Sequence, residues 1–198
     1  MAKSDVTKNA LADSLKRIMA NTPFERITIQ NICDGAQISR RTFYQHFFDK
    51  YELLNWMFLN DYRKQNSGER PDNIWEIYLN TCRYIYQDQQ VYRNALTVTG
   101  QNSFRSFCTQ LMTPLLKENF IHEFKTESES EFFINILTNA SWDALYNWLN
   151  ETPCQDPDTF YFSFIQSLSL FSKRLSEIAQ DAMSRAINNH LDKSNVDH

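Results

Sequence analysis

The sequence predicts an all-α protein with two domains, residues 1–64 and 65–198, and about nine helices in total. Glycine occurs three times and proline five times in 198 residues, whereas an average soluble chain of this length contains about fourteen glycines. Hairpin-rich sheet folds need many glycine turns, so this scarcity disfavours them. Apolar residues recur at the 3.6-residue period of amphipathic helices, with capping residues between the apolar stretches.

Four helices are expected in the first domain, at about residues 4–21, 28–36, 39–47 and 50–64. Thr28 and Ser39 are residue types that cap helices, and each stands just before an apolar stretch. Asp49 followed by Glu52 forms a capping box, which opens the fourth helix. The first two apolar stripes consist of Leu11, Leu15, Ile18 and Met19, and of Ile29, Ile32, Cys33 and Ala36.

Five helices are expected in the second domain, at about residues 74–88, 90–99, 102–125, 127–151 and 156–191. The polar segment 65–73, which contains Gly68 and Pro71, is the expected linker. Pro114 removes a backbone donor from the helix at 102–125 and should kink it. Asp156 and Pro157 have the residue types of an N-cap and a first helical position, so they should begin the last helix.

Residues 28–47 have the pattern of two short helices joined by a tight turn, as in a helix-turn-helix. Phe43 and Phe47 stand four residues apart and can pack against the preceding apolar stripe. The other side of the second helix presents three polar pairs at i, i+4 spacing: Arg40/Tyr44, Arg41/Gln45 and Thr42/His46. Arginine and glutamine can bind the edges of guanine and adenine, and tyrosine, threonine and histidine can bind phosphate oxygens. The second helix is therefore a candidate for the major groove of DNA.

Residues 28–54, TIQNICDGAQISRRTFYQHFFDKYELL, resemble the DNA-binding domain of TetR/AcrR-family transcriptional regulators. The shared pattern is a threonine-led helix, a turn, Ser-x-x-Thr-Phe-Tyr-x-His-Phe, and then a lysine with a Glu-Leu-Leu helix. The resemblance implies contacts with the DNA backbone by Thr28, Ser39, Tyr44, His46 and Lys50. It implies base readout by Arg40, Arg41, Thr42 and Gln45, and it leaves Gln30 open between a base contact and a solvated surface residue.

The turn departs from the family pattern. Family members usually place glycine two residues before the serine that caps the recognition helix, where a positive φ is convenient. That position is Gln37 here, and the nearest glycine is Gly35. Either Gln37 adopts a left-handed conformation or the turn starts earlier, and the sequence leaves both alternatives open.

The two domains differ in charge. Residues 1–64 contain ten Lys/Arg and seven Asp/Glu, whereas residues 65–198 contain ten Lys/Arg and seventeen Asp/Glu. A basic segment followed by an acidic one indicates that only the first domain meets a polyanion such as DNA.

The last two expected helices are apolar on more than one side, and such helices must bury both sides. One side can pack within the domain and the other against a second copy, as the resemblance implies for a homodimer. A fully internal helix pair in a monomer is the alternative. The stripe on the final helix consists of Phe160, Phe164, Leu168, Phe171, Leu175 and Ile178.

The resemblance implies a sequence-specific DNA-binding transcriptional regulator, a ligand-responsive repressor that binds a palindromic operator as a homodimer. Residues 51–61 and 132–151 are more faintly similar to the branch that includes the dihydroxyacetone-kinase operon regulator. This similarity supports an alternative, an activator controlled by a partner protein. Aromatic side chains of the second domain could line an effector pocket or form the core, and we interpret the following residues as core: Trp75, Tyr78, Cys82, Tyr86, Phe104, Phe107 and Trp142.

Several other functional classes are disfavoured. The three glycines stand more than thirty residues apart, which excludes P-loops, Rossmann fingerprints and nucleophile elbows. Paired metal and acid/base motifs are absent, so we expect no enzymatic activity, no cofactor and no metal site. The four widely spaced cysteines are expected to be reduced thiols, and the lack of a signal or membrane-spanning segment predicts a cytoplasmic protein. A helical interaction adaptor that does not bind DNA is the alternative from another class.

Overall fold

A computed structural model describes residues 3–66, 73–100, 102–120 and 126–194. Within these ranges the chain forms nine α-helices, one short 3-10 helix and no strand. The predicted all-α fold is confirmed. The helices are α1 (Lys3–Met19), η1 (Phe24–Arg26), α2 (Ile29–Ala36), α3 (Arg40–Tyr44), α4 (Lys50–Gln65), α5 (Ile74–Gln87), α6 (Gln89–Leu96), α7 (Phe104–Phe120), α8 (Glu127–Asn150) and α9 (Pro157–Ser194).

The helix boundaries follow the capping residues. Thr28, Ser39 and Asp49 are the N-caps of α2, α3 and α4, as their residue types predict. Helix α3 ends at Tyr44, earlier than expected, because the N–H groups of Gln45 and His46 bond carbonyls three residues back. Residues 67–72 of the expected linker, with Gly68 and Pro71, lie outside the described residues. So do residues 121–125, at the end of the helix expected at 102–125.

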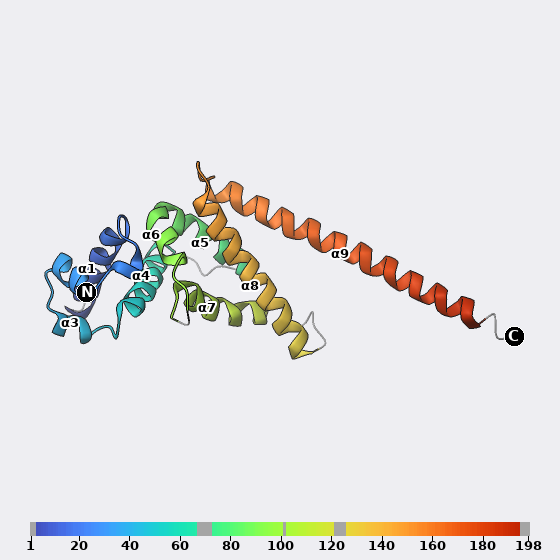
Figure 1. Cartoon of the computed structure of the whole chain (residues 1–198), viewed down its shortest axis with the longest axis horizontal. Helices are drawn as coiled ribbons and strands as arrows, with labels where there is room; N and C mark the ends of the chain where they lie inside the picture. The colour runs from blue at the N-terminus through green and yellow to red at the C-terminus, as the bar shows by residue number, and fades with distance from the viewer. Residues whose placement is uncertain (1–2, 67–72, 101, 121–125, 195–198) are drawn as a thin grey trace. The chain divides into compact units, whose positions relative to one another are not determined.

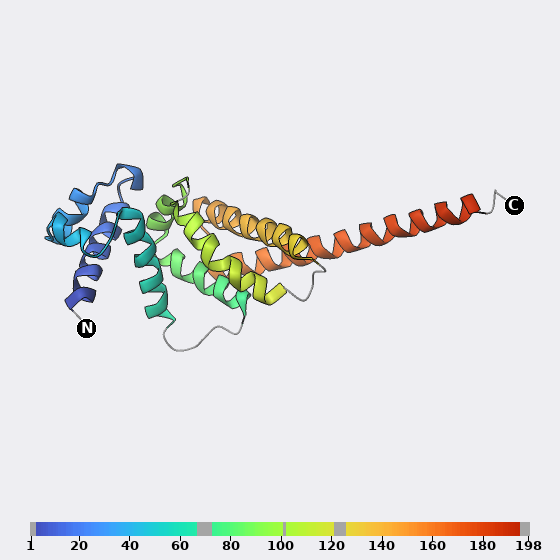
Figure 2. The same ribbon diagram turned by 90° about the horizontal axis from the view of Figure 1, so that it is seen from below.

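The chain divides into two compact units, residues 1–157 and 158–198. In the first unit, α1 packs against α2, α4 and α6, and α7 packs against α4 and α8. Figures 1 and 2 show α1 and α3 at one end of this unit, with α4 between them and α5 to α8. The domain boundary predicted at residue 64 lies near the end of α4, within the first unit, and stays a prediction. The second unit is formed by α9.

The apolar residues expected in the core are largely buried. Leu11, Leu15, Met19, Ile32 and Cys33 form the interior around α1 and α2. Among the aromatic and cysteine candidates of the second half, those that are buried are Tyr78, Cys82, Phe104 and Trp142. Those that are half-buried are Trp75, Tyr86 and Phe107.

Candidate nucleic-acid interface

The turn between α2 and α3 is built on Gln37. Its φ of 56° and ψ of 38° lie in the left-handed region, which costs a non-glycine residue roughly 1–2 kcal/mol. The Gln37 N–H donates to the Asp34 carbonyl at 3.2 Å, and the Ile38 N–H donates to the Cys33 carbonyl at 3.0 Å. These bonds satisfy the last carbonyls of α2. Of the two alternatives that the sequence left open, the structure shows the left-handed Gln37.

Gly35 lets α1 and α2 approach each other closely. A Cβ atom at this position would lie 2.4 Å from Ser14 Oγ, well inside van der Waals contact. Ser14 is fully buried, and its hydroxyl donates to the Ile32 carbonyl at 2.8 Å. Arg17 adds a bond of 2.9 Å to the Gly35 carbonyl. Glycine is therefore required at this helix contact, while the turn itself is made by Gln37.

Gly35→Ala is expected to lower the free energy of unfolding by about 1–3 kcal/mol, because the new methyl group must displace the Ser14 hydroxyl. Urea denaturation followed by circular dichroism measures the change. In a Ser14→Ala background the same substitution should cost less, since the nearest remaining atom, the Cβ of residue 14, is 3.6 Å away. Equal costs in the two backgrounds would contradict this steric explanation.

Two buried phenylalanines, one in α3 and one three residues after its end, fix the orientation of α3. Phe43 and Phe47 are buried, and their ring centroids lie 5.9 Å apart. At the start of the helix, Ser39 Oγ accepts from the Thr42 N–H at 3.1 Å, and the two hydroxyls lie 2.9 Å apart. The inward packing that the sequence predicted for both phenylalanines is confirmed. It orients the opposite side of α3 toward solvent.

The outer face of α3 carries the side chains predicted to read bases. Arg40 and Tyr44 are exposed and contact each other: Arg40 Nη2 donates to Tyr44 Oη at 3.4 Å, and the guanidinium lies 6.0 Å from the ring centroid. Arg41 and Gln45 are also exposed. Within the described part of the chain, neither of these two side chains has a hydrogen-bond or ion-pair partner. Both are therefore available to bind an external ligand, whereas His46 beside them is half-buried.

Thr28 caps α2 through reciprocal bonds with Asn31. Thr28 Oγ1 accepts from the Asn31 N–H at 3.1 Å, and Asn31 Oδ1 accepts from the Thr28 N–H at 2.9 Å and from its hydroxyl at 2.6 Å. Thr28 is exposed at the beginning of an eight-residue helix, where free N–H groups favour an anion. This position is compatible with the predicted phosphate contact.

Lys50 lies inside a cage of backbone carbonyls. Its Nζ donates to the carbonyl oxygens of Phe24 at 2.7 Å, Glu25 at 3.1 Å and Ile27 at 2.8 Å, and it lies 4.6 Å from the Phe24 ring centroid. Desolvation by burial lowers the pKa of this ammonium group. An ammonium has three N–H donors, and all three are engaged here. This placement competes with the phosphate contact that the sequence predicted for Lys50, and it makes Lys50 a residue that positions η1.

Asn94 on α6 holds the same segment from the other side. Its Nδ2 donates to the carbonyls of Met19 at 3.0 Å and Thr22 at 2.6 Å, and its Oδ1 accepts from the Phe24 N–H at 2.7 Å. The backbone of Phe24 is therefore bonded to α6 through its N–H and to Lys50 on α4 through its carbonyl. No local sequence pattern indicates this contact, because the bonded residues are about 70 positions apart.

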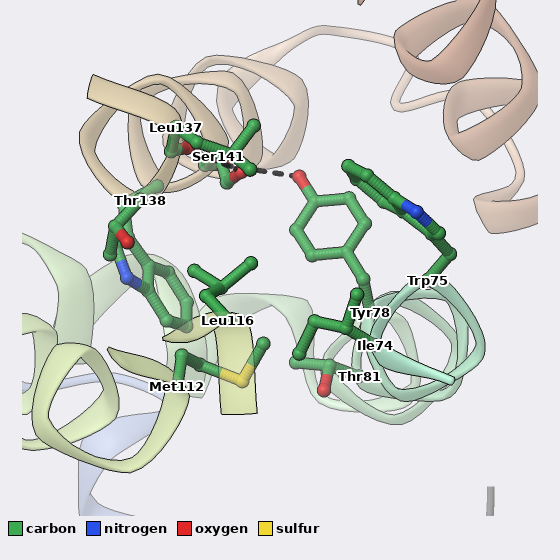
Figure 3. Close-up of a pocket in the computed structure, with 10 residues that line it drawn as sticks. Ile74, Trp75, Tyr78, Thr81, Met112, Leu116, Leu137, Thr138 and Ser141 are labelled. Atoms are coloured by element: carbon green, nitrogen blue, oxygen red, sulfur yellow. Dashed lines mark hydrogen bonds between the residues drawn. The ribbon is translucent and has the colours of Figure 1, made fainter. Parts of the chain in front are cut away.

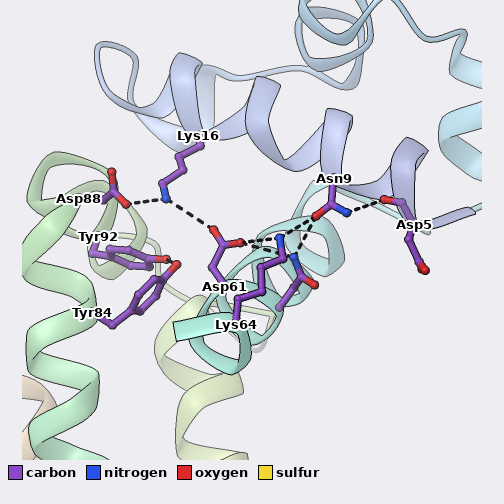
Figure 4. Close-up of polar contacts among 9 residues, drawn as sticks. Asp5, Asn9, Lys16, Asp61, Lys64, Tyr84, Asp88 and Tyr92 are labelled. Carbon is purple, nitrogen blue, oxygen red and sulfur yellow. Dashed lines mark hydrogen bonds and ion pairs between the residues drawn. The ribbon is translucent and has the colours of Figure 1, made fainter. Parts of the chain in front are cut away.

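A polar cluster joins α1, α4 and the turn between α5 and α6 (Figure 4). Lys16 Nζ lies 3.5 Å from Asp61 and 2.5 Å from Asp88. Tyr84 and Tyr92 share a buried hydrogen bond in the same cluster, and burial raises the pKa of both phenols. Partly exposed ion pairs contribute about 0–1 kcal/mol. We therefore expect this cluster to help align α1 with α6 and to add little to the overall stability.

Two cavities beside α7 differ in size and openness. A cavity of about 30 Å³ lies between α5, α7 and α8, where the Tyr78 hydroxyl donates to the Ser141 carbonyl at 3.1 Å (Figure 3). An open apolar groove of about 330 Å³ is lined in part by Phe58 and Tyr62 of α4 and by Leu111 of α7. Small-molecule sites usually have about 300–1,000 Å³. The groove has this capacity, and the cavity has room for about one water molecule.

The described residues contain neither a metal site nor a disulfide. No group of three or more His, Cys, Asp and Glu side chains there could hold a metal ion. All four cysteine thiols are free, as predicted, and burial raises the pKa of Cys108. None of the helices described is both long and apolar enough to cross a membrane.

Comparison with protein families gives two matches along the chain. The family described as bacterial regulatory proteins, tetR family, matches residues 11–57, which contain α2, α3 and their capping residues. The family described as transcriptional regulator C-terminal region matches residues 72–169. The two matches therefore cover both the candidate interface and most of the helices that follow it.

Individual proteins show the same relationship. The HTH-type dhaKLM operon transcriptional activator DhaS of Lactococcus lactis subsp. lactis (strain IL1403) is 28% identical over 127 residues, 64% of this chain and 68% of that protein. A solved structure of a dihydroxyacetone kinase operon activator DhaS covers 85% of this chain and 97% of its own, with a TM-score of 0.57 and 19% identity. A TetR transcriptional regulator from Streptococcus agalactiae 2603V covers 83% of this chain and 94% of its own, with a TM-score of 0.63 and 17% identity. At these identities the two structures show a shared fold.

Proposed function

The chain belongs to the TetR family of bacterial regulatory proteins and is a DNA-binding transcriptional regulator without enzymatic function; from this premise we propose that it binds a palindromic operator as a homodimer. Each copy inserts α3 into the major groove of one half-site. Arg41 and Gln45 read bases, joined by Arg40 and Thr42. Four further residues contact the phosphate backbone of the DNA: Thr28, Ser39, Tyr44 and His46.

One observation carries this proposal: α3 has a buried apolar face and an exposed polar one. Phe43 and Phe47 anchor the helix, while Arg41 and Gln45 are exposed and unpaired within the described residues. Exposed arginine and glutamine are the residues that bind guanine and adenine in pairs of hydrogen bonds. A structural helix of the protein interior would not need them.

A homodimer would compensate for the few DNA contacts that a single copy can make. A single helix-turn-helix makes few phosphate contacts, and a twofold axis doubles them on two half-sites. Apolar residues exposed on α8 are available to a second copy, among them Phe132 at 70% and Ile136 at 52% exposure. Helix α9, considered separately, also exposes apolar residues.

Selection from a pool of random DNA duplexes tests this function. We expect enrichment of an inverted repeat whose halves are related by the twofold axis of the protein. If each half contacts about four phosphates, the logarithm of affinity should fall against the logarithm of salt with a slope near −7. Enrichment of no sequence by a dimeric sample would overturn the proposal in favour of an adaptor that does not bind DNA.

For control of the regulator, we propose a ligand-responsive repressor. The apolar groove beside Phe58 and Tyr62 lies on α4, the helix whose Lys50 holds η1. A ligand in this groove can change operator affinity only by binding more tightly to one conformation of α4 than to another. Transcription in vitro from a template carrying the selected repeat should fall when the protein is added and recover with such a ligand.

A second candidate is an activator controlled by a partner protein. The name of the Lactococcus lactis relative describes a transcriptional activator, and the cavity between α5, α7 and α8, about 30 Å³, is too small for a metabolite. The same transcription assay separates the two candidates. An increase in transcript on addition of the protein favours activation, and a decrease favours repression.

A further inference from the structure

Helix α9 carries a heptad pattern of apolar residues. These residues alternate in spacing by three and four, which aligns them along one face for a partner helix. The set, which we call the seam, consists of Tyr161, Phe164, Leu168, Phe171, Leu175, Ile178 and Ala182. From Phe171 onward the seam is exposed, with Phe171 at 62%, Leu175 at 49% and Ile178 at 52%.

We propose that residues 171–182 of α9 pair with the same residues of a second copy in antiparallel direction, with Arg174 of each copy facing Asp181 of the other. The proposal deepens the homodimer described under Proposed function and rests on it. It specifies the contacting surface of α9, the direction of the two helices and the register in which they pair.

Twofold symmetry selects the register. In a twofold interface, if residue i contacts residue j of the second copy, then j contacts i. The exposed part of the seam, residues 171–182, covers itself completely only when Phe171 faces Ala182 and Leu175 faces Ile178. A shift by one heptad toward the N-terminus would also pair apolar residues of the seam, Phe171 with Leu175 and Leu168 with Ile178, but it would place Arg174 opposite Arg174 of the second copy.

The same register pairs the charges beside the seam. Arg174 directly precedes Leu175, and Asp181 directly precedes Ala182, so both lie on the same side of the seam. In the antiparallel arrangement, the Phe171/Ala182 pair and the Leu175/Ile178 pair form two neighbouring apolar layers. Arg174 of one copy and Asp181 of the other both lie between these two layers. The symmetric contact therefore gains two pairs of opposite charge.

Alternative partners of Arg174 explain its position less well. In a parallel, in-register pair, Arg174 would face Ala179 of the second copy. Within one helix, Arg174 and Asp181 are seven residues and about 10 Å apart, too far for a direct bond. Arg174 does bond Glu177 of its own helix at 2.9 Å, but this contact is exposed to solvent, with 71% of the arginine side chain accessible.

Charge-reversed variants test the proposal without DNA. Arg174→Glu places two like-charged pairs in the dimer, and so does Asp181→Arg, so each variant should self-associate about tenfold more weakly than the original chain. An equal mixture of the two variants restores both attractive pairs. At equilibrium, native mass spectrometry of differently tagged chains should find about nine in ten dimers mixed, where random association gives about half.

Two controls complete the test. Lys173→Glu changes the same charge on the side of α9 away from the seam, and it should leave self-association unchanged. The double variant R174E/D181R should recover the dimerisation of the original chain. A mixed fraction near one half, a double variant as weak as its parents, or a monomeric original chain would overturn the pairing. Failure to select an operator would overturn only the DNA-binding proposal.

Discussion

Arg41→Ala is expected to weaken binding to the selected operator by about 2–6 kcal/mol, because each half-site loses about 1–3 kcal/mol. The guanidinium is exposed on α3, and no described residue engages it, so the loss falls on the complex with little effect on the folded protein. Titration of labelled duplex at constant salt measures the change. Preference should also relax at one base position in each half-site.

A matched variant separates base readout from general electrostatics. Arg26→Ala removes the same charge from an exposed arginine in η1, outside α3. We expect a small loss for Arg26→Ala, similar for all duplexes. If Arg41→Ala weakened every duplex equally and left the selected sequence unchanged, Arg41 would be a phosphate contact.

The features that could be predicted from the sequence are those set by neighbouring residues. Thr28, Ser39 and Asp49 cap helices through side chains that accept from N–H groups three residues away, so the sequence alone locates these helix starts. The burial of Phe43 and Phe47 follows in the same way from their spacing. The fold class, the helix order and the exposed face of α3 could therefore be predicted from the sequence.

The features that escaped prediction depend on residues distant in the sequence. Gly35 is explained only by Ser14 on another helix, and Asn94 is explained only by the carbonyls at the end of α1. Lys50 has the residue type of a phosphate ligand, but its position relative to η1 decides where its ammonium lies. Residue type and local spacing cannot supply such contacts, because they arise when helices pack.

Lys50→Met is expected to lower the free energy of unfolding by about 2–3 kcal/mol, because three carbonyl oxygens lose their charged donor while the aliphatic stem is kept. The melting temperature should fall by about 4–12 °C. Operator affinity should decrease for all sequences alike, as η1 and the Thr28 cap loosen. Scanning calorimetry and the salt dependence of binding measure these two effects.

The salt dependence decides between the two roles of Lys50. If the ammonium stays with the carbonyls of η1, Lys50→Met leaves the slope unchanged. If it contacts a phosphate in each half-site, the slope should shrink by about 2 while stability changes little. Lys64→Met, at the other end of α4 and with a side chain 57% exposed, controls for the loss of charge. It should leave stability nearly unchanged.

A double-mutant cycle then tests whether Lys50 and Asn94 act through the same segment. Both residues bond the backbone of Phe24, one at its carbonyl and the other at its N–H. If η1 is the shared element, Asn94→Ala should cost less stability in the Lys50→Met background than alone, by about 0.5–3 kcal/mol. Additive costs would mean that α4 and α6 hold the DNA-binding helices independently. Coupled costs would mean that a movement of either helix reaches Thr28, and with it α2 and α3, through η1.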